Sequence, residues 1–227
     1  MHFFDHWILD RANKVEVEVD SLPACVVPNV HGADRLFIRS WGTLHPGLLL
    51  SLDRRCARDS LVLTSSHPGL VALASGLGFE LHVFRWTDAY VCSGMISTRW
   101  AEPNDLKAVH DFFVAWHRDE PSPVEKWAIA QEDRPIMGII AQAASTPTVG
   151  FLSSLIVDPT KRRRGVGYSL LAYAVNEHVR ALGCAALIHR SSNLPSRRLS
   201  DRLGLHAMPF VALESPDIAR LAEGNSP

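Results

Sequence analysis

The chain has 227 residues, of which 47% are hydrophobic and 21% charged, a composition typical of a globular protein that buries its own core. Its 23 basic and 24 acidic residues give a net charge of −1, which excludes a global basic field for nucleic acid or anionic lipid. Any anion site must therefore be local.

The cysteines argue against a disulfide framework or a cysteine-type zinc site, because they are widely spaced and show no C-x-x-C pair. We therefore predict a reduced, cytoplasmic protein without a metal. The N-terminus lacks the basic start and apolar run of a secretory signal. No apolar stretch approaches the roughly 20 residues that span a bilayer, so we predict no membrane segment.

The first half of the sequence predicts a strand over Arg35–Trp41 and a helix over Leu48–Cys56. The connection between them, Gly42–Gly47, carries no Lys or Arg. It therefore has none of the charge that a phosphate-binding turn would use.

An internal similarity links the two halves of the chain. Leu61–Ser66 precedes a helical stretch that ends at Gly78, and Leu187–Ser192 precedes one that ends at Gly204. The two stretches align without a gap, which is typical of a duplicated strand–helix–strand unit, although Ser-Ser and Leu-Gly are common enough to recur by chance.

The second half predicts a longer series of elements. Helical spacing and end signals predict a helix after Pro103, another that starts near Gly165 and stops at Gly183, and a third between Ser192 or Asn193 and Gly204. Runs of apolar residues between turn signals predict the strands Met95–Trp100, Trp127–Gln131, Ile136–Ala144, Thr148–Val157, Ala185–His189 and His206–Leu213. The tail from Pro216 to Pro227 is expected to form a frayed helix.

The turn before the second helix combines three features of an anion site. A strand ends at Val157, and the helix that starts near Gly165 presents unpaired backbone N–H groups. Gly165 and Gly167 leave the backbone open to close approach. Arg162, Arg163 and Arg164 supply guanidinium groups that suit phosphate oxygens, which favours a phosphate or diphosphate ligand over a nucleic-acid contact or a nuclear-import signal.

These residues resemble a family signature. Arg162-Arg-Arg-Gly-Val-Gly167 is similar to the Arg/Gln-x-x-Gly-x-Gly/Ala motif of the GNAT superfamily of N-acetyltransferases. Asn193 to Leu205 resembles the second signature of that family, and the resemblance covers roughly residues 95–213. It implies an α/β fold of GNAT type, a mixed, twisted β-sheet flanked by helices. It also implies acetyl-CoA, or another acyl-CoA, as co-substrate.

The resemblance implies roles for single residues. Main-chain groups of Leu155–Val157 would pair with the pantetheine arm, and the Val157 N–H would polarise the thioester carbonyl. Asn193 would bind the same arm or cap its helix. The expected cofactor-binding residues are Leu155, Ile156, Val157, Arg162, Arg163, Arg164, Gly165, Val166, Gly167, Tyr168, Ser169, Asn193 and Ser196.

The proton-transfer residues depart from the family pattern. Ser200 stands where the family often carries a Tyr that protonates the leaving thiolate, and the strand Thr148–Val157 has no carboxylate. His189 is a candidate base because an imidazole titrates near neutral pH, with a structural histidine as the alternative. Ser153 or Ser154 should face the cleft and relay a proton through water. The candidate catalytic residues are therefore His189, Ser154 and Ser200.

The sequence thus predicts two parts, a degenerate GNAT-like half over residues 1–94 and an acetyltransferase domain over residues 95–227. Only one strand is evident after Gly204, so the first half is expected to supply the missing edge of the sheet. We predict an N-acyltransferase, monomeric or homodimeric, that uses a small-molecule amine as acceptor and binds neither nucleic acid nor membrane. The alternatives are acyl transfer to a protein lysine or a hydroxyl, and a non-catalytic acyl-CoA sensor or scaffold.

Overall fold

The computed structural model describes residues 16–19, 22–30, 33–38, 61–66, 68–116, 124–132, 135–143, 145–213 and 217. Its contacts divide the chain into two compact units. The first unit comprises Met1–Phe84, His189–Leu194 and Ala207–Pro227, and the second comprises Arg85–Ile188 and Pro195–His206. Each unit is described by itself below.

The second unit is built on a mixed β-sheet. Its strands are β6 (Thr98–Trp100), β7 (Lys126–Gln131), β8 (Ile136–Gln142), β9 (Gly150–Val157) and β10 (Ala185–Arg190). Strands β6 to β9 pair antiparallel in sequence order, and β10 then pairs parallel to β9. A parallel pair needs a crossover, and helix α5 (Val166–Leu182) provides it.

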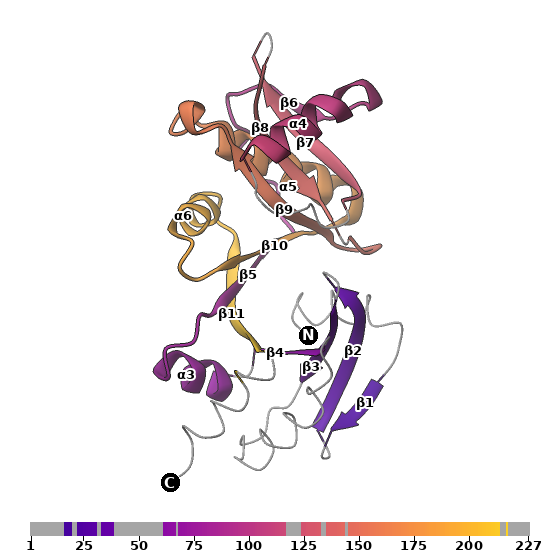
Figure 1. Cartoon of the computed structure of the whole chain (residues 1–227), viewed down its shortest axis with the longest axis vertical. Coiled ribbons are helices and arrows are strands. Elements are labelled where there is room, and N and C mark those ends of the chain that lie inside the picture. The colour runs from indigo at the N-terminus through magenta and orange to yellow at the C-terminus, as the bar shows by residue number, and fades with distance from the viewer. Residues whose placement is uncertain are drawn as a thin grey trace. The chain divides into compact units, whose positions relative to one another are not determined.

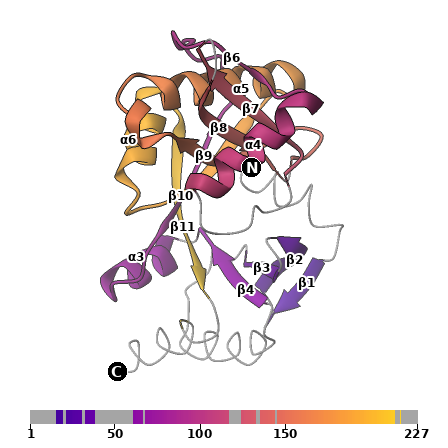
Figure 2. The same cartoon turned by 45° about the horizontal axis from the view of Figure 1, so that its top comes forward.

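Helices cover both faces of this sheet because successive strand residues point to opposite sides. Ala128 and Ala130 of β7 pack in one apolar cluster with α5, whereas Ile129 packs in another with α4 (Leu106–Trp116). Figures 1 and 2 show α4 and α5 separated by the strands between them. The predicted mixed sheet flanked by helices is therefore present.

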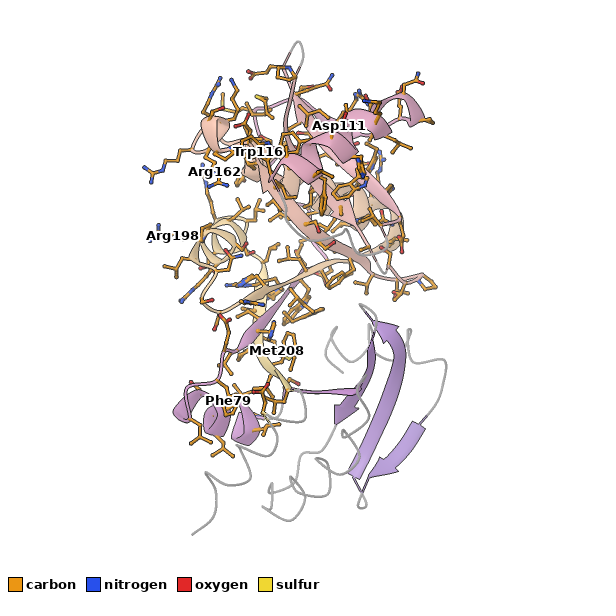
Figure 3. The ribbon with its side chains drawn as sticks, in the orientation of Figure 1. Phe79, Asp111, Trp116, Arg162, Arg198 and Met208 are labelled. Carbon is orange, nitrogen blue, oxygen red and sulfur yellow. The ribbon has the colours of Figure 1, made fainter. Side chains whose placement is uncertain are left out.

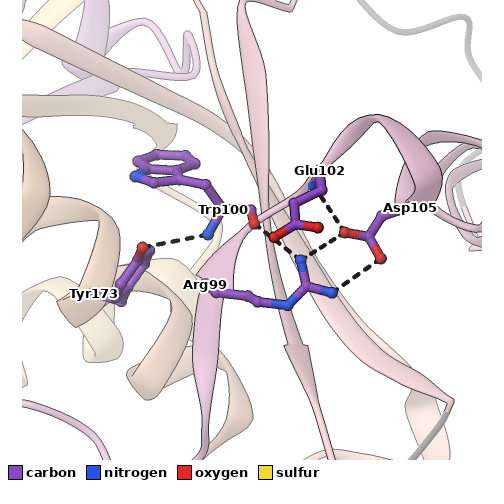
Figure 4. Close-up of polar contacts among 5 residues, drawn as sticks. All are labelled: Arg99, Trp100, Glu102, Asp105 and Tyr173. Carbon is purple, nitrogen blue, oxygen red and sulfur yellow. Dashed lines mark hydrogen bonds and ion pairs between the residues drawn. The ribbon is translucent and has the colours of Figure 1, made fainter.

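Helix α4 begins where the sequence places a proline. A short 3-10 turn, Pro103–Asp105, leads into it, and the Asp105 carboxylate accepts a hydrogen bond from the Glu102 N–H at 2.8 Å. The same carboxylate pairs with Arg99 at 2.6 and 3.0 Å (Figure 4). Hydrogen bonds from Arg99 and then Glu102 lower the pKa of Asp105, so the carboxylate that starts this helix stays ionised.

The predicted strand Met95–Trp100 is shorter in the structure, where only Thr98–Trp100 pairs with β7. The reason is a competing partner. The Ile96 N–H donates to the Ser169 hydroxyl of α5 at 3.1 Å, so at Ile96 the chain is bound to the helix and not to the sheet.

The first unit contains β1 (Glu16–Val19), β2 (Leu22–Val30), β3 (Ala33–Ile38), β4 (Leu61–Ser65), most of β11 (His206–Leu213), and helix α3 (Pro68–Gly76). These strands run in the order β1-β2-β3-β4-β11. Of the predictions for this half, β3 corresponds to the expected strand Arg35–Trp41 but ends at Ile38. The helix expected over Leu48–Cys56 lies outside the described residues, and of the C-terminal tail Pro216–Pro227 only Asp217 is described, as helical.

Strand β5 (His82–Thr87) was not predicted, and its residues divide between the two units, with His82–Phe84 in the first and Arg85–Thr87 in the second. Within the first unit the His82 and Phe210 rings lie 5.3 Å apart, and within the second the Trp86 and His206 rings are also 5.3 Å apart. The expectation that the first half supplies the missing edge of the sheet stays a prediction.

Candidate functional site

The pairing of strand β9 with β8 is interrupted halfway along its length. Ser153 pairs with Ala141 of β8, and Ile156 pairs with Ile139, so two residues of β9 stand opposite one of β8. This is a β-bulge, and Ser154 within it has φ 48. The parallel pairing with β10 covers Gly150–Leu152 and stops before the bulge. In the described sheet, β9 beyond the bulge therefore has a free edge on its β10 side.

The turn after β9 places exposed backbone at the start of α5. Asp158 and the 3-10 turn Pro159–Lys161 lead into Arg162, and Gly165 caps the helix in the left-handed region with φ 86. No side chain caps this end, and the first intrahelical bond runs from the Ser169 N–H to the Gly165 carbonyl at 2.9 Å. The amides of Val166–Tyr168 are therefore open at the positive end of the helix dipole.

Three arginines, Arg162, Arg163 and Arg164, precede these amides in the sequence. Arg162 donates to the Val157 carbonyl at 3.4 Å, and Arg164 lies 3.6 Å from Glu132. Arg163 is exposed and is held at φ 61, a strained conformation of a kind that clusters at functional sites. Figure 3 shows Arg162 projecting from the turn and Arg198 from α6 (Leu194–Arg202). The turn thus combines a helix N-terminus with three guanidinium groups.

Hydrogen bonds to Asp158, the first residue of the turn, hold the start of the turn in place. The Asp158 carboxylate accepts hydrogen bonds from the backbone N–H and the hydroxyl of Thr160, both at 2.8 Å. These bonds lower the pKa of Asp158, the backbone bond most strongly. The anionic Asp158 therefore fixes the entry to the turn without occupying the amides of α5.

Different structural features explain the two glycines of the turn. Gly165 needs its positive φ, which other residues rarely adopt. Gly167 does not, and a Cβ placed on it would meet Val157 at 3.5 Å and Leu199 at 3.8 Å, which are ordinary contacts. Packing within the chain therefore does not require a glycine at position 167. A ligand that approaches the backbone closely would require one.

The side chains of Tyr168 and Ser169 are engaged within the chain. The Tyr168 hydroxyl donates to the Cys92 carbonyl at 3.1 Å, and the Arg202 guanidinium lies 4.8 Å from the centre of the Tyr168 ring. Ser169 is buried and accepts from Ile96. For Tyr168 the free group is its backbone amide, while the amide of Ser169 already donates to Gly165.

The second predicted signature lies on and before α6. Ser196 is half-buried, and Leu199 packs against the core that α5 shares. Asn193 is exposed, and its N–H donates to the Arg190 carbonyl at 3.0 Å. The helix is anchored by Arg85, a buried residue that pairs with Asp201 at 2.8 Å and reaches the Leu205 carbonyl at 3.4 Å. This anchor could not be predicted from the sequence, because the partners of Arg85 are more than a hundred residues away.

The three candidate catalytic residues lie in different surroundings. Ser200 is completely buried, and its hydroxyl has no hydrogen-bond partner among the described residues. Ser154 is half-buried in the bulge of β9. His189 belongs to the first unit, is buried, and has its Nδ1 at 2.9 Å from the Arg190 carbonyl. Their roles stay predictions. Ser153, the neighbour of Ser154, also has a buried hydroxyl without a partner in the described part of the chain.

Two further findings concern the described residues alone. They contain no group of three or more His, Cys, Asp or Glu side chains that could hold a metal ion. None of the helices within the described ranges has the length and apolar character needed to traverse a lipid bilayer.

Comparison with known proteins identifies the class of the chain. Residues 87–205, more than half of the sequence, match the Acetyltransferase (GNAT) family. No curated protein matches the sequence.

Solved structures of GNAT proteins have a similar fold. A GCN5-related N-acetyltransferase from Sphaerobacter thermophilus has a TM-score of 0.56 at 18% identity, covering 84% of this chain and 75% of that one. Another from Kribbella flavida has a TM-score of 0.56 at 15% identity, covering 92% and 91%. An acetyltransferase of the GNAT family from Novosphingobium aromaticivorans has a TM-score of 0.55 at 16% identity, covering 94% and 99%.

The mixed sheet and the crossover helix define an acyltransferase fold. The chain belongs to the GNAT family of acetyltransferases. The predicted fold class, the family and the assignment as an acetyltransferase enzyme are confirmed.

Proposed function

We propose that this protein is an N-acyltransferase that moves an acetyl or other acyl group from acyl-CoA to the amine of a small molecule. The observation that carries the proposal is the start of α5. Its first-turn amides are uncapped, three arginines precede them in the turn, and Gly167 is free of the packing that would explain a glycine. A diphosphate is the chemistry that such a turn binds best.

The pyrophosphate of acyl-CoA would accept hydrogen bonds from the amides of Arg163–Tyr168, with Arg162 and Arg163 adding charge. The free edge of β9 supports the next part of the proposal. The amide and carbonyl groups of Leu155–Val157 would pair with the pantetheine arm as a neighbouring strand does. Asn193 and Ser196 are proposed to contact the same arm from the start of α6.

The reaction would be a direct transfer. The neutral amine attacks the thioester carbonyl carbon, a C–N bond forms and the C–S bond breaks. The nitrogen loses one proton and the thiolate of CoA gains one. His189, Ser154 and Ser200 are the proposed groups for these proton transfers, and the Val157 N–H is the proposed donor to the developing oxyanion. Holding both reactants in one orientation would supply much of the acceleration.

Gly167→Ala tests the cofactor site separately from the fold. The added methyl group meets only ordinary contacts in the protein, and alanine is the better helix residue. We expect the melting temperature to stay equal or rise. The dissociation constant for CoA, measured by calorimetry, should increase about tenfold or more, because the methyl group would hold a phosphate away from the amides.

A matched control is Gly76→Ala, which also adds a methyl group without a clash, but on α3. It should leave CoA binding unchanged. Unaltered CoA affinity in Gly167→Ala would contradict the proposed placement of the pyrophosphate. The acceptor class is tested by following free thiol while wild-type protein, acetyl-CoA and a panel of small amines react, and turnover on hydroxyl compounds or protein lysines alone would contradict it.

A further inference from the structure

The chain between β5 and β6 lies along helix α5, and we call its segment Val91–Ile96 the strap. One end of the strap is held by a single side chain. Asn176 of α5 accepts a hydrogen bond from the Val91 N–H at 2.8 Å and donates one to the Val91 carbonyl at 3.0 Å. Both backbone groups of one residue are thus bound by one amide, which fixes the position and the direction of the chain at Val91.

The other end of the strap is held against the first turns of α5. A Cβ placed on Gly94 would lie 2.4 Å from the Ser169 Cα and 2.1 Å from its Oγ. No side chain fits there unless the strap or the helix moves. The Ile96 N–H donates to the Ser169 hydroxyl at 3.1 Å, and the Cys92 carbonyl accepts from the Tyr168 hydroxyl at 3.1 Å.

These contacts fall on the residues that complete the proposed phosphate turn. Ser169 closes the first helical bond with Gly165, so its position determines where the helix begins. Tyr168 carries the last open amide of the first turn. Its hydroxyl is held by the strap, and its ring lies under the Arg202 guanidinium of α6. The orientation of the open amides therefore depends on contacts from both sides.

We propose that the strap is a positioning element for the phosphate turn, with Gly94 and Asn176 as its positioning residues. This inference rests on the proposed CoA site. Neither residue touches the ligand. Gly94 allows the strap to approach Ser169, and Asn176 holds the strap's far end two helical turns from Tyr168. Electrostatic binding by preset amides is strongest when they need no reorganisation as the anion arrives.

The experiment compares CoA affinity with stability in two pairs of variants. Asn176→Ala removes both hydrogen bonds to Val91, and its control Glu177→Ala changes the next residue of the same helix, which pairs with Arg180. Gly94→Ala displaces the strap, and its control Gly76→Ala adds a methyl group in open space. Calorimetry with CoA and thermal melting are measured on all four variants and on the wild type.

We expect Asn176→Ala and Gly94→Ala to raise the CoA dissociation constant about fivefold or more at a temperature where both are folded, while the controls match the wild type. A purely structural strap would lower the melting temperature and leave the affinity unchanged, and that result would overturn the inference. If Gly94→Ala does not fold, the CoA affinity of Asn176→Ala alone tests the inference. Wild-type protein that fails to bind CoA would overturn the proposed function and the inference together, whereas normal binding by every variant would overturn the inference alone.

Discussion

Stability should fall between pH 7 and pH 5 because of one buried histidine. His178 of α5 is 2% exposed, and its Nε2 has no hydrogen-bond partner among the described residues. Gly150 lies against the His178 ring, so closely that a Cβ added to Gly150 would lie 2.1 Å from a ring carbon. Burial, with a smaller contribution from the Lys126 charge, lowers the pKa of His178 to about 4. The folded protein therefore holds this imidazole neutral.

The direction of the effect follows from linkage. The unfolded chain binds a proton at His178 below its ordinary pKa of 6.5, whereas the folded chain does so only near 4. The neutral histidine therefore costs no stability above pH 6.5, and stability is lost as the pH falls below that value. At pH 5, about 1.5 units below the unfolded pKa, the loss is about 2 kcal/mol at 1.36 kcal/mol per unit.

The assay is urea unfolding of wild type and His178→Gln at pH 7 and pH 5. Only the change between the two pH values is compared, so any packing defect of the variant cancels, as do the other histidines. Wild type should lose about 2 kcal/mol more than His178→Gln over this interval. Equal losses in the two proteins would refute the assignment of a buried, neutral His178.

Two more predictions concern packing and thiol chemistry. Gly138→Ala should lower the free energy of unfolding by about 1–3 kcal/mol in urea titrations, because its Cβ would lie 2.9 Å from both the Ile156 carbonyl oxygen and the Leu170 side chain. Gly76→Ala should not, and equal stability of the two variants would contradict the packing described for β8. Burial raises the pKa of Cys184 to about 12, so mass spectrometry after thiol labelling at pH 8 should find Cys184 unmodified in the folded protein and the exposed Cys92 modified. Labelling of both at equal rates would contradict the burial of Cys184.

The position of the turn before α5, the proposed phosphate site, was predictable because its signals are local. A strand end, two glycines and three arginines lie within a dozen residues, and the structure places the start of α5 at Val166, beside the predicted start. The bounds of β11, His206–Leu213, also match the prediction. These elements depend mainly on neighbours in sequence, which a single chain displays.

The elements that were missed depend on distant partners. Strand β5 carries buried Arg85 and Thr87 and does not alternate between buried and exposed residues, so its pattern does not resemble a half-buried strand. Arg85 is tolerated inside because Asp201 pairs with it from α6. The strap is similar, since nothing near Gly94 in the sequence indicates that Ser169 lies against it. The proton-transfer residues also stay undetermined by sequence, because their roles depend on the position of the reacting sulfur.

The internal similarity between the halves includes individual backbone hydrogen bonds. Helix α3 spans Pro68–Gly76 and α6 spans Leu194–Arg202, which are the same positions in the gap-free alignment. Both helices end in a glycine with positive φ, Gly78 at 78 and Gly204 at 71. Three backbone bonds close each end, from Leu77, Gly78 and Phe79 in one case and Leu203, Gly204 and Leu205 in the other.

Helices α3 and α6 differ in their side chains. Helix α3, Pro-Gly-Leu-Val-Ala-Leu-Ala-Ser-Gly, carries no charge, whereas α6 carries Arg197, Arg198, Asp201 and Arg202. Asp201 holds α6 through Arg85, and Arg202 lies over Tyr168 beside the phosphate turn. The shared backbone is therefore what a strand–helix–strand unit needs in order to fold. The charged residues are found only on α6, and Arg202 is the one that lies beside the proposed cofactor site.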